Sequence, residues 1–182
     1  MCLLVLLGVL VLSCGPVQSR YCRFVSENLK QTHESIAEPL ELKQPVVSSR
    51  PLFSPLIQSI NGSCQRREQV LVINATLDVY LRIFSSVLQQ NQNQNQIPGQ
   101  NPVLLDQLPA ESRSQVLSAL VDLQQKMMKL KKHLNLERED TLKSVLSTLD
   151  KMDVDDLIVQ KKALAEFTLV YQAASVIGSK HC

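Results

Sequence analysis

Residues 68–90 read EQVLVINATLDVYLRIFSSVLQQ, and this stretch decides the fold. Its apolar side chains recur at helical spacing along two neighbouring stripes. A helix with two apolar stripes and one narrow polar strip is surrounded by other helices on most sides. The stretch therefore predicts the central helix of a bundle. The two stripes are Val70, Ile73, Leu77, Leu81, Phe84 and Leu88, and Val72, Thr76, Val79, Ile83 and Val87.

The helical pattern continues on both sides of this stretch. Ser26 is a candidate N-cap for a short first helix. After the central helix, apolar residues alternate at spacings of four and three, which is typical of a bundle seam. No run alternates with a period of two for long enough to make a sheet, so the expected fold class is all-α. The six predicted helices span residues 26–35, 56–60, 68–90, 111–134, 141–152 and 154–175.

Two internal segments break the helical pattern. Residues 36–55 contain four prolines, which preclude a long helix there. We expect an extended loop, and long loops on compact domains frequently carry function. Residues 89–101 are rich in Gln and Asn and include Pro98 and Gly99, which predicts a linker.

The composition narrows the class of protein. The chain has 182 residues, of which 45% are hydrophobic and 4% aromatic, so one domain with an aliphatic core is expected. A net charge of +2 is too even to imply a nucleic-acid surface. Glycine-rich phosphate loops and the CxxC, HExxH and GxSxG motifs are missing from the sequence. We therefore expect neither an enzyme nor a metal or other cofactor site.

The N-terminal residues resemble a signal peptide. Residues 1–19 carry no charged side chain, and residues 3–12 form an apolar run that is too short to span a bilayer. Val17 and Ser19 are small enough for the −3 and −1 cleavage positions. We expect cleavage after Ser19, which leaves residues 20–182 as one secreted helical domain without membrane insertion.

Three of the five cysteines lie beyond this leader: Cys22, Cys64 and Cys182. In an oxidising compartment at most two of them can pair within one chain. A disulfide between Cys22 and Cys182 would tie the two ends of one chain or link neighbouring chains. The alternative is that Cys182, as the last residue, is an unpaired thiol.

Two Asn-x-Ser/Thr triplets predict N-glycosylation, which fits a secreted chain. Asn61 precedes a glycine in an expected turn. Asn74 lies on the predicted polar face of the central helix. Both are candidate acceptors.

A basic cluster lies on the helix predicted at residues 111–134. It could bind an acidic partner or a sulfated glycan, but helical spacing places it on the solvent side of a Leu/Met seam. An ordinary solvated face is the favoured interpretation. The cluster consists of Lys126, Lys129, Lys131, Lys132 and His133.

Residues 159–170 read VQKKALAEFTLV. The order is an aliphatic residue, Gln, any residue, a basic residue, Ala, two of any kind, Glu, Leu or Phe, two of any kind, and Ile or Val. This order resembles the signature of the interferon gamma (type II interferon) family. Residues 27–30 also resemble the start of the family's first helix. All seven specified positions of the signature match: Val159, Gln160, Lys162, Ala163, Glu166, Phe167 and Val170.

The resemblance implies a helical cytokine that forms an interlocked homodimer and clusters cell-surface interferon gamma receptor chains. Such a protein triggers immune and antiviral signalling and macrophage activation. In the family, the first helix, the following loop and part of the last helix contact the receptor. These map here onto residues 27–30, residues 36–53 and the outward side of the last helix. The candidate receptor-binding side chains are Glu27, Asn28, Lys30, Lys161 and Lys162.

Helical spacing makes a separate prediction for Glu166. It places this glutamate beside an apolar stripe of the last helix, where it should be partly buried. A buried carboxylate needs a hydrogen-bonded or cationic partner. The rest of the signature reads mainly as core packing, with Lys161 and Lys162 pointing outward.

The chain departs from the family pattern at two places. Ala165 stands where mammalian members carry a receptor-contacting histidine. The family's basic tail is replaced by a short tail, residues 172–182, with a single lysine, Lys180. In this respect the chain is similar to the interferon-gamma-related forms of fish.

Two other functions remain open. One is an interleukin-10 or interleukin-22 type cytokine, although these usually carry paired intrachain cysteines, which three mature cysteines fit poorly. The other is a secreted amphipathic lipid-binding protein. Its helices would present wide exposed apolar faces, whereas the twin stripes of residues 68–90 suit a buried helix better.

Overall fold

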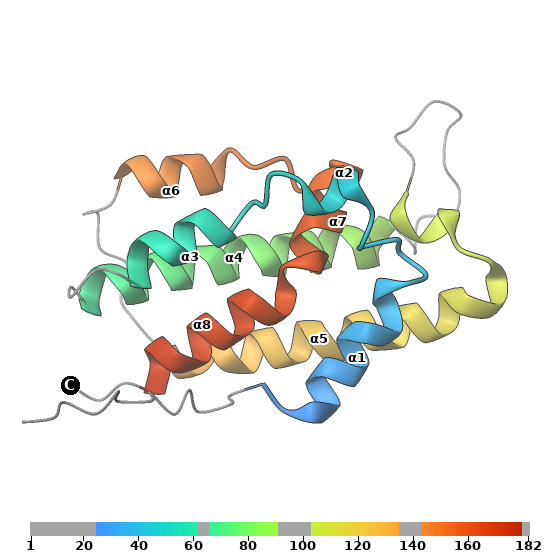
Figure 1. Cartoon of the computed structure of the whole chain (residues 1–182), viewed down its shortest axis with the longest axis horizontal. Coiled ribbons are helices and arrows are strands. Elements are labelled where there is room, and N and C mark those ends of the chain that lie inside the picture. Colours follow the sequence, from blue (N-terminus) through green and yellow to red (C-terminus); the bar gives the residue numbers. More distant parts are fainter. Residues whose placement is uncertain (1–24, 62–65, 91–102, 135–142, 180–182) are drawn as a thin grey trace, which may run out of the picture.

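The computed structural model describes residues 25–61, 66–90, 103–134 and 143–179. Within these ranges every regular element is helical, so the predicted all-α class is confirmed (Figure 1). The elements are α1 (Glu27–Ala37), α2 (Pro45–Ser48), α3 (Ser54–Asn61), α4 (Arg66–Gln90), the 3-10 helix η1 (Leu104–Gln107), α5 (Ala110–Leu134), α6 (Lys143–Asp150), α7 (Leu157–Ala165) and α8 (Phe167–Ser179).

The central position predicted for residues 68–90 is confirmed by α4. This helix crosses the middle of the molecule and contacts α3, α5, α6, α7 and α8 (Figure 1). Side chains from both predicted stripes are buried, among them Leu77 and Ile83. Buried Thr76 donates its hydroxyl hydrogen to the Val72 carbonyl, 2.8 Å away, and so satisfies its only polar group within the helix.

A small cluster of aromatic rings joins α4 to the C-terminal half of the chain. The ring of Tyr80 lies 4.8 Å from that of Phe53 and 6.3 Å from that of Phe167. Phe84 meets Phe167 edge-on at 6.0 Å. All four rings are fully buried. The aromatic residues of the described ranges therefore concentrate where α4, α8 and the segment before α3 meet, and aliphatic side chains fill most of the remaining core.

The last helix differs from the prediction. Residues 154–175 were expected to form one helix, but α7 ends at Ala165 and α8 begins at Phe167. Between them Glu166 adopts φ −89° and ψ 3°, and its N–H is shared between the carbonyls of Lys162 and Ala163. The break turns the Glu166 side chain toward the segment before α3.

The expected C-terminal tail is also mostly helical. Helix α8 continues to Ser179, four residues beyond the expected end of the last helix at residue 175, and so includes residues 172–179 of the tail. Ala174 and Ile177 are buried against the bundle. Apolar burial therefore extends the helix beyond the end predicted from the sequence.

The proline-rich loop after α1 contains one short helix, α2, where an extended segment was expected. Pro45 is its first residue, a position at which the missing N–H leaves no hydrogen bond unmade. Two non-glycine residues near its ends have left-handed backbones, Glu41 with φ 56° and Arg50 with φ 55°. By contrast, the predicted N-cap of the first helix is confirmed, since the Ser26 hydroxyl accepts the N–H of Leu29 at 3.2 Å.

Several predictions concern residues outside the described ranges. These are the signal peptide, the three mature cysteines, most of the Gln/Asn-rich linker and the last three residues of the chain. Asn61 is the last residue of α3, and Asn74 lies half-buried on α4. Glycosylation of either remains a prediction.

One helix in the described part of the chain, α4, is long and apolar enough to cross a membrane by length and composition. However, 61% of its most apolar stretch is buried inside the bundle. The core helix of a bundle meets the same criterion, so α4 gives no separate argument for a membrane span.

Truncating Phe167 tests the aromatic junction. We expect Phe167→Ala to lower the free energy of unfolding by about 3–5 kcal/mol, because it opens a cavity between α4 and α8. Leu169→Ala, at a position of α8 that is 40% exposed, is the matched control and should cost about 0.5 kcal/mol. Urea unfolding followed by circular dichroism measures both, and equal losses would contradict this account of the core.

Candidate functional site

The carboxylate of Glu166 binds the start of α3. Its Oε1 accepts the N–H of Leu52 at 2.5 Å, and its Oε2 accepts those of Phe53 at 2.9 Å and Ser54 at 2.7 Å. The first N–H groups of a helix have no acceptor within the helix, and they form its positive end. A carboxylate from 112–114 residues further along the chain supplies that acceptor. The predicted need of Glu166 for a partner is confirmed, and the partners are backbone N–H groups.

The two lysines of α7 are also engaged by the loop. The Nζ of Lys161 lies 3.2 Å from Oε2 of Glu41, and the Nζ of Lys162 donates to the carbonyl of Arg50 at 3.1 Å. The prediction that Lys161 points outward is wrong, because the residue is only 6% exposed. Helix α2 packs over α7 and covers the aliphatic stem, while the ammonium group reaches Glu41 at the edge. Lys162 is half-buried by the same loop.

The candidate residues of α1 lie at the exposed end of that helix. Glu27 is exposed and forms an ion pair with Lys30 at 3.4 Å, an i,i+3 contact of small energetic weight. Asn28 is exposed too, and its Oδ1 accepts a hydrogen bond from Lys126 of α5 at 3.2 Å. These three side chains remain accessible to a partner molecule.

His33 links α1 to α7, a contact that the sequence analysis did not predict. Its Nε2 lies 2.8 Å from the carbonyl oxygen of Leu164, and because a carbonyl only accepts, Nε2 carries the hydrogen. The imidazole also stacks on Phe167, with 5.9 Å between ring centroids. The sequence did contain a signal for this contact, since the spacing of His33 from Leu29 and Ile36 places it at the edge of the inward face of α1.

Tyr80 of α4 also binds α7 close to this contact. Its hydroxyl donates to the carbonyl of Ala163 at 2.7 Å. Burial raises the pKa of Tyr80 well above the ordinary value of 10.0, and the negative charge of Glu166 adds to the rise. The phenol therefore stays protonated and holds α7 against α4.

The remaining signature residues pack in the core and do not face solvent. Ala163, Phe167 and Val170 are fully buried, and Val159 is half-buried. Buried Gln160 donates through Nε2 to the hydroxyl of Ser86 and to the carbonyl of Val154, both at 3.0 Å. The expectation that most of the signature is core packing is confirmed.

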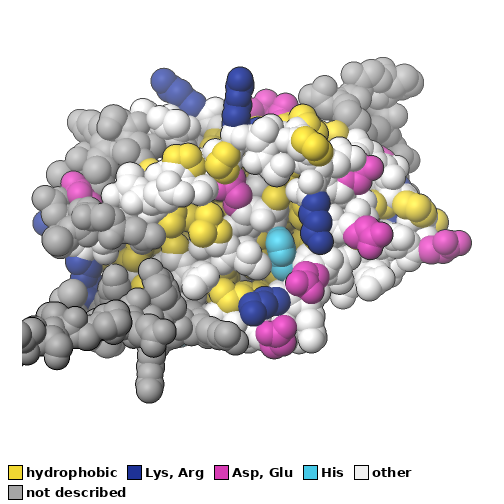
Figure 2. All heavy atoms as spheres, in the orientation of Figure 1, with side chains coloured by type: hydrophobic (Ala, Val, Ile, Leu, Met, Phe, Trp, Pro, Cys, Tyr) yellow, Lys and Arg dark blue, Asp and Glu magenta, His cyan; other side chains and the backbone are white. Residues whose placement is uncertain are grey.

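We use "loop surface" for the exposed residues between α1 and α3. Figure 2 shows that charged side chains of both signs alternate with neutral ones over the part of the molecule where α1, α2 and α7 lie in Figure 1. Val46 on α2 is 52% exposed, more than the other large apolar side chains in the described ranges that stand out at the surface. The loop surface consists of Glu38, Glu41, Lys43, Gln44, Pro45, Val46, Ser48, Ser49, Arg50 and Pro51.

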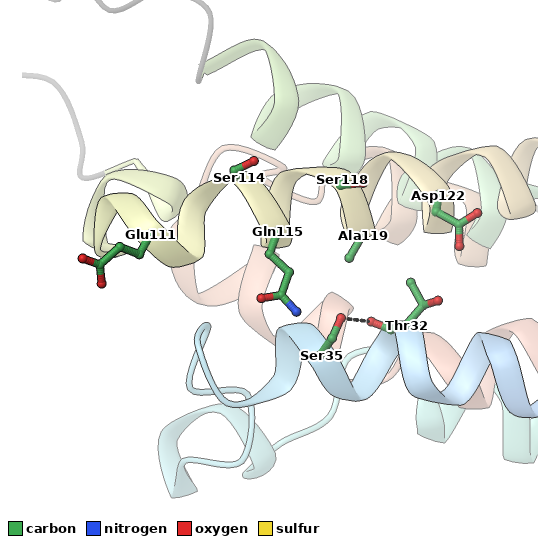
Figure 3. A pocket seen from close by; sticks show the side chains of 8 residues that line it. All are labelled: Thr32, Ser35, Glu111, Ser114, Gln115, Ser118, Ala119 and Asp122. Atoms are coloured by element: carbon green, nitrogen blue, oxygen red, sulfur yellow. Dashed lines mark hydrogen bonds between the residues drawn. The ribbon is translucent and has the colours of Figure 1, made fainter.

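An open groove of about 580 Å³ lies between α1 and α5 (Figure 3). Gln115 points from α5 toward Ser35 of α1, whereas Glu111 points away to solvent (Figure 3). The hydroxyl of Ser35 donates to the carbonyl of Thr32 within its own helix. The groove thus offers short polar side chains but no arrangement of a nucleophile and a base. In the described part of the chain no three His, Cys, Asp or Glu side chains are placed to hold a metal ion.

The basic cluster on α5 is partly neutralised. Lys126 pairs with Asp122 on the same helix, and Lys131 pairs with Asp78 of α4. Lys129 and Lys132 are exposed to solvent. This arrangement agrees with an ordinary solvated face.

The raised pKa of Tyr80 predicts how stability depends on pH. In the unfolded chain this phenol ionises near pH 10, whereas in the folded chain it remains protonated, so rising pH favours unfolding. We expect the free energy of unfolding of the wild type to fall above pH 10 by about 1.4 kcal/mol more per pH unit than that of Tyr80→Phe. Urea titrations between pH 8 and 11 measure the difference, and parallel profiles of the two proteins would contradict the assignment.

Comparison with known proteins gives one distant relative. The chain is 25% identical to interferon gamma 1 of Carassius auratus over 154 residues, which cover 84% of this chain and 74% of the relative. No family model matches the chain, and no solved structure matches it. The similarity spans most of both chains and indicates a distant relationship to interferon gamma.

Proposed function

We propose that this chain is a secreted type II interferon-like cytokine that binds and clusters cell-surface interferon gamma receptor chains. The outcome would be immune and antiviral signalling and macrophage activation. The distant similarity to a fish interferon gamma and the seven-position signature across α7 and α8 support this function.

One observation carries the proposal. Of the three segments that the family resemblance assigns to receptor contact, the last helix lies more than a hundred residues after α1 and the following loop, yet α7 adjoins both in the fold. Helix α1 reaches α7 through His33, and the loop reaches α7 through Glu41 and Arg50. A single receptor chain could therefore touch α1 and the loop surface together.

The loop surface has the chemistry of a protein–protein contact. Val46 provides an exposed apolar centre, and charged residues such as Lys43 and Arg50 provide a polar rim around it. Interfaces commonly combine an apolar core with a polar rim. We place the receptor's main contact at α2, with Glu27 and Lys30 of α1 at its margin.

Receptor clustering requires two such surfaces, which an interlocked homodimer would supply. Within one chain, α8 packs on α1, α3, α4 and α5. In an interlocked dimer the same contacts would form between two copies, with the last helices of each copy inserted into the other. Each dimer would then present two identical loop surfaces.

The lipid-binding alternative lacks a matching surface in the described residues. The large apolar side chains that are exposed there are one each on α2, α7 and α8 and two on α5: Val46, Ile158, Leu169, Val121 and Met128. A lipid-binding helix would gather such residues on one wide face. The scattered exposure of apolar side chains favours the cytokine function over lipid binding.

The C-terminal end can be tested without disturbing the bundle. Deletion after Tyr171 would remove buried Ala174 and Ile177, so loss of activity would report misfolding. Deletion after Ser179 removes residues 180–182 and leaves α8 whole, so it is the informative truncation.

Substitution of Val46 tests the receptor surface. We expect Val46→Asp to weaken binding to receptor-bearing cells about tenfold or more, because it places a charge at the apolar centre of the contact. Met128→Asp on α5 is the matched control, since Met128 is also exposed, at 46%, and lies outside the loop surface. Equal binding by the wild type and Val46→Asp would contradict this placement.

The dimer has its own test. Two versions of the chain with different affinity tags are mixed either as folded proteins or unfolded and refolded together. An interlocked dimer exchanges subunits only by unfolding, so mixed dimers should form after refolding and not after native mixing. Rapid native exchange, or a monomer at micromolar concentration by light scattering, would contradict interlocking.

A further inference from the structure

We propose that Lys161, Lys162 and Glu166 are positioning residues, which hold the loop before α3 in the shape that a receptor binds and do not touch the receptor themselves. The part of this inference that concerns the receptor rests on the proposed function. The part that concerns the loop stands on the geometry alone.

The strain in the loop coincides with the two lysine contacts. Among the described residues, Glu41 and Arg50 are the non-glycine residues with positive φ. A side chain disfavours this backbone conformation, which persists only where surrounding contacts impose it. Lys161 contacts the side chain of Glu41, and Lys162 contacts the carbonyl of Arg50.

Glu166 fixes the far end of the same loop. Its carboxylate accepts the N–H groups of Leu52, Phe53 and Ser54, directly after the strained Arg50. Three side chains within residues 161–166 thus contact the loop at three places along its length. This arrangement pre-forms the loop, and a pre-formed loop loses less conformational entropy when a partner binds.

The same contacts leave Lys161 and Glu166 little capacity to bind a receptor. Lys161 is covered by the loop, and both carboxylate oxygens of Glu166 already accept hydrogen bonds. Val46 and the polar side chains around it are the part of the loop that faces outward. The signature segment therefore fixes the conformation of the loop surface from its buried side.

Hydrogen–deuterium exchange of the full chain, with no receptor present, tests the positioning role. We expect Glu166→Gln to speed exchange of peptides covering residues 40–54 by about tenfold or more, because a neutral amide offers one acceptor oxygen in place of two charged ones. Lys161→Met and Lys162→Met should speed exchange of the loop near Glu41 and Arg50 respectively. Lys132→Met, at an exposed lysine of α5, is the control and should change nothing in the loop.

A rescue experiment separates positioning from direct contact. Arg50→Gly removes the penalty of the left-handed backbone and keeps the carbonyl that Lys162 binds. We expect Lys162→Met to weaken binding to receptor-bearing cells and to speed loop exchange in the wild-type background, but to change neither when added to Arg50→Gly. The single variant Arg50→Gly gives the cost of losing the Arg50 side chain from the loop surface. If Lys162 contacted the receptor directly, Lys162→Met would weaken binding equally in the wild-type and Arg50→Gly backgrounds.

The outcomes separate the two proposals. Unchanged loop exchange in all three variants, or exchange that rises equally in α4 and α5, would overturn the positioning role whatever the chain binds. Faster loop exchange together with a wild type that does not bind receptor-bearing cells would support positioning and overturn the proposed function.

Discussion

A partly buried carboxylate and the N–H groups at the start of a helix satisfy each other's hydrogen-bonding needs in this protein. Glu166 lies between apolar residues and requires hydrogen-bond donors, while the first N–H groups of α3 require acceptors. Their contact explains why the last helix breaks at Glu166, since the chain turns there to direct the carboxylate onto α3. It also places Phe53 against Tyr80, so the aromatic junction depends on the same interaction. The phenol of Tyr80 stays neutral beside this charge and holds α7 in place.

The bundle and the loop have different physical tasks. Helix α4 supplies apolar surface in several directions, which stabilises the fold without reference to any partner. The loop after α1 buries Leu40, Leu42, Val47 and Phe53, but its two left-handed residues are exposed and need support from outside the loop. Helix α7 connects these tasks, because Ala163 faces the core while Lys161 and Lys162 reach the loop. A signature that is mostly buried can therefore still govern what the surface presents.

Sequence periodicity predicted the elements whose causes are local. The twin stripes of α4 and the N-cap at Ser26 follow from spacing and residue type, and both are present in the structure. The burial of Glu166 also followed from spacing, but its partners did not, because they lie more than a hundred residues earlier. The break in the last helix could not be predicted from residue type, because residues 154–175 contain no proline or glycine. The burial of Lys161 depends on α2 folding over α7, a tertiary contact that no window of sequence contains.

The most direct test of this account is amide hydrogen exchange in the wild-type chain at single-residue resolution by NMR. If the Glu166 carboxylate holds the start of α3, the amides of Leu52, Phe53 and Ser54 should exchange as slowly as those in the middle of α4. These amides precede or begin a helix and have no acceptor within it, so only the contact with Glu166 protects them. Exchange of the three amides at the rate of exposed loop residues would contradict the central claim.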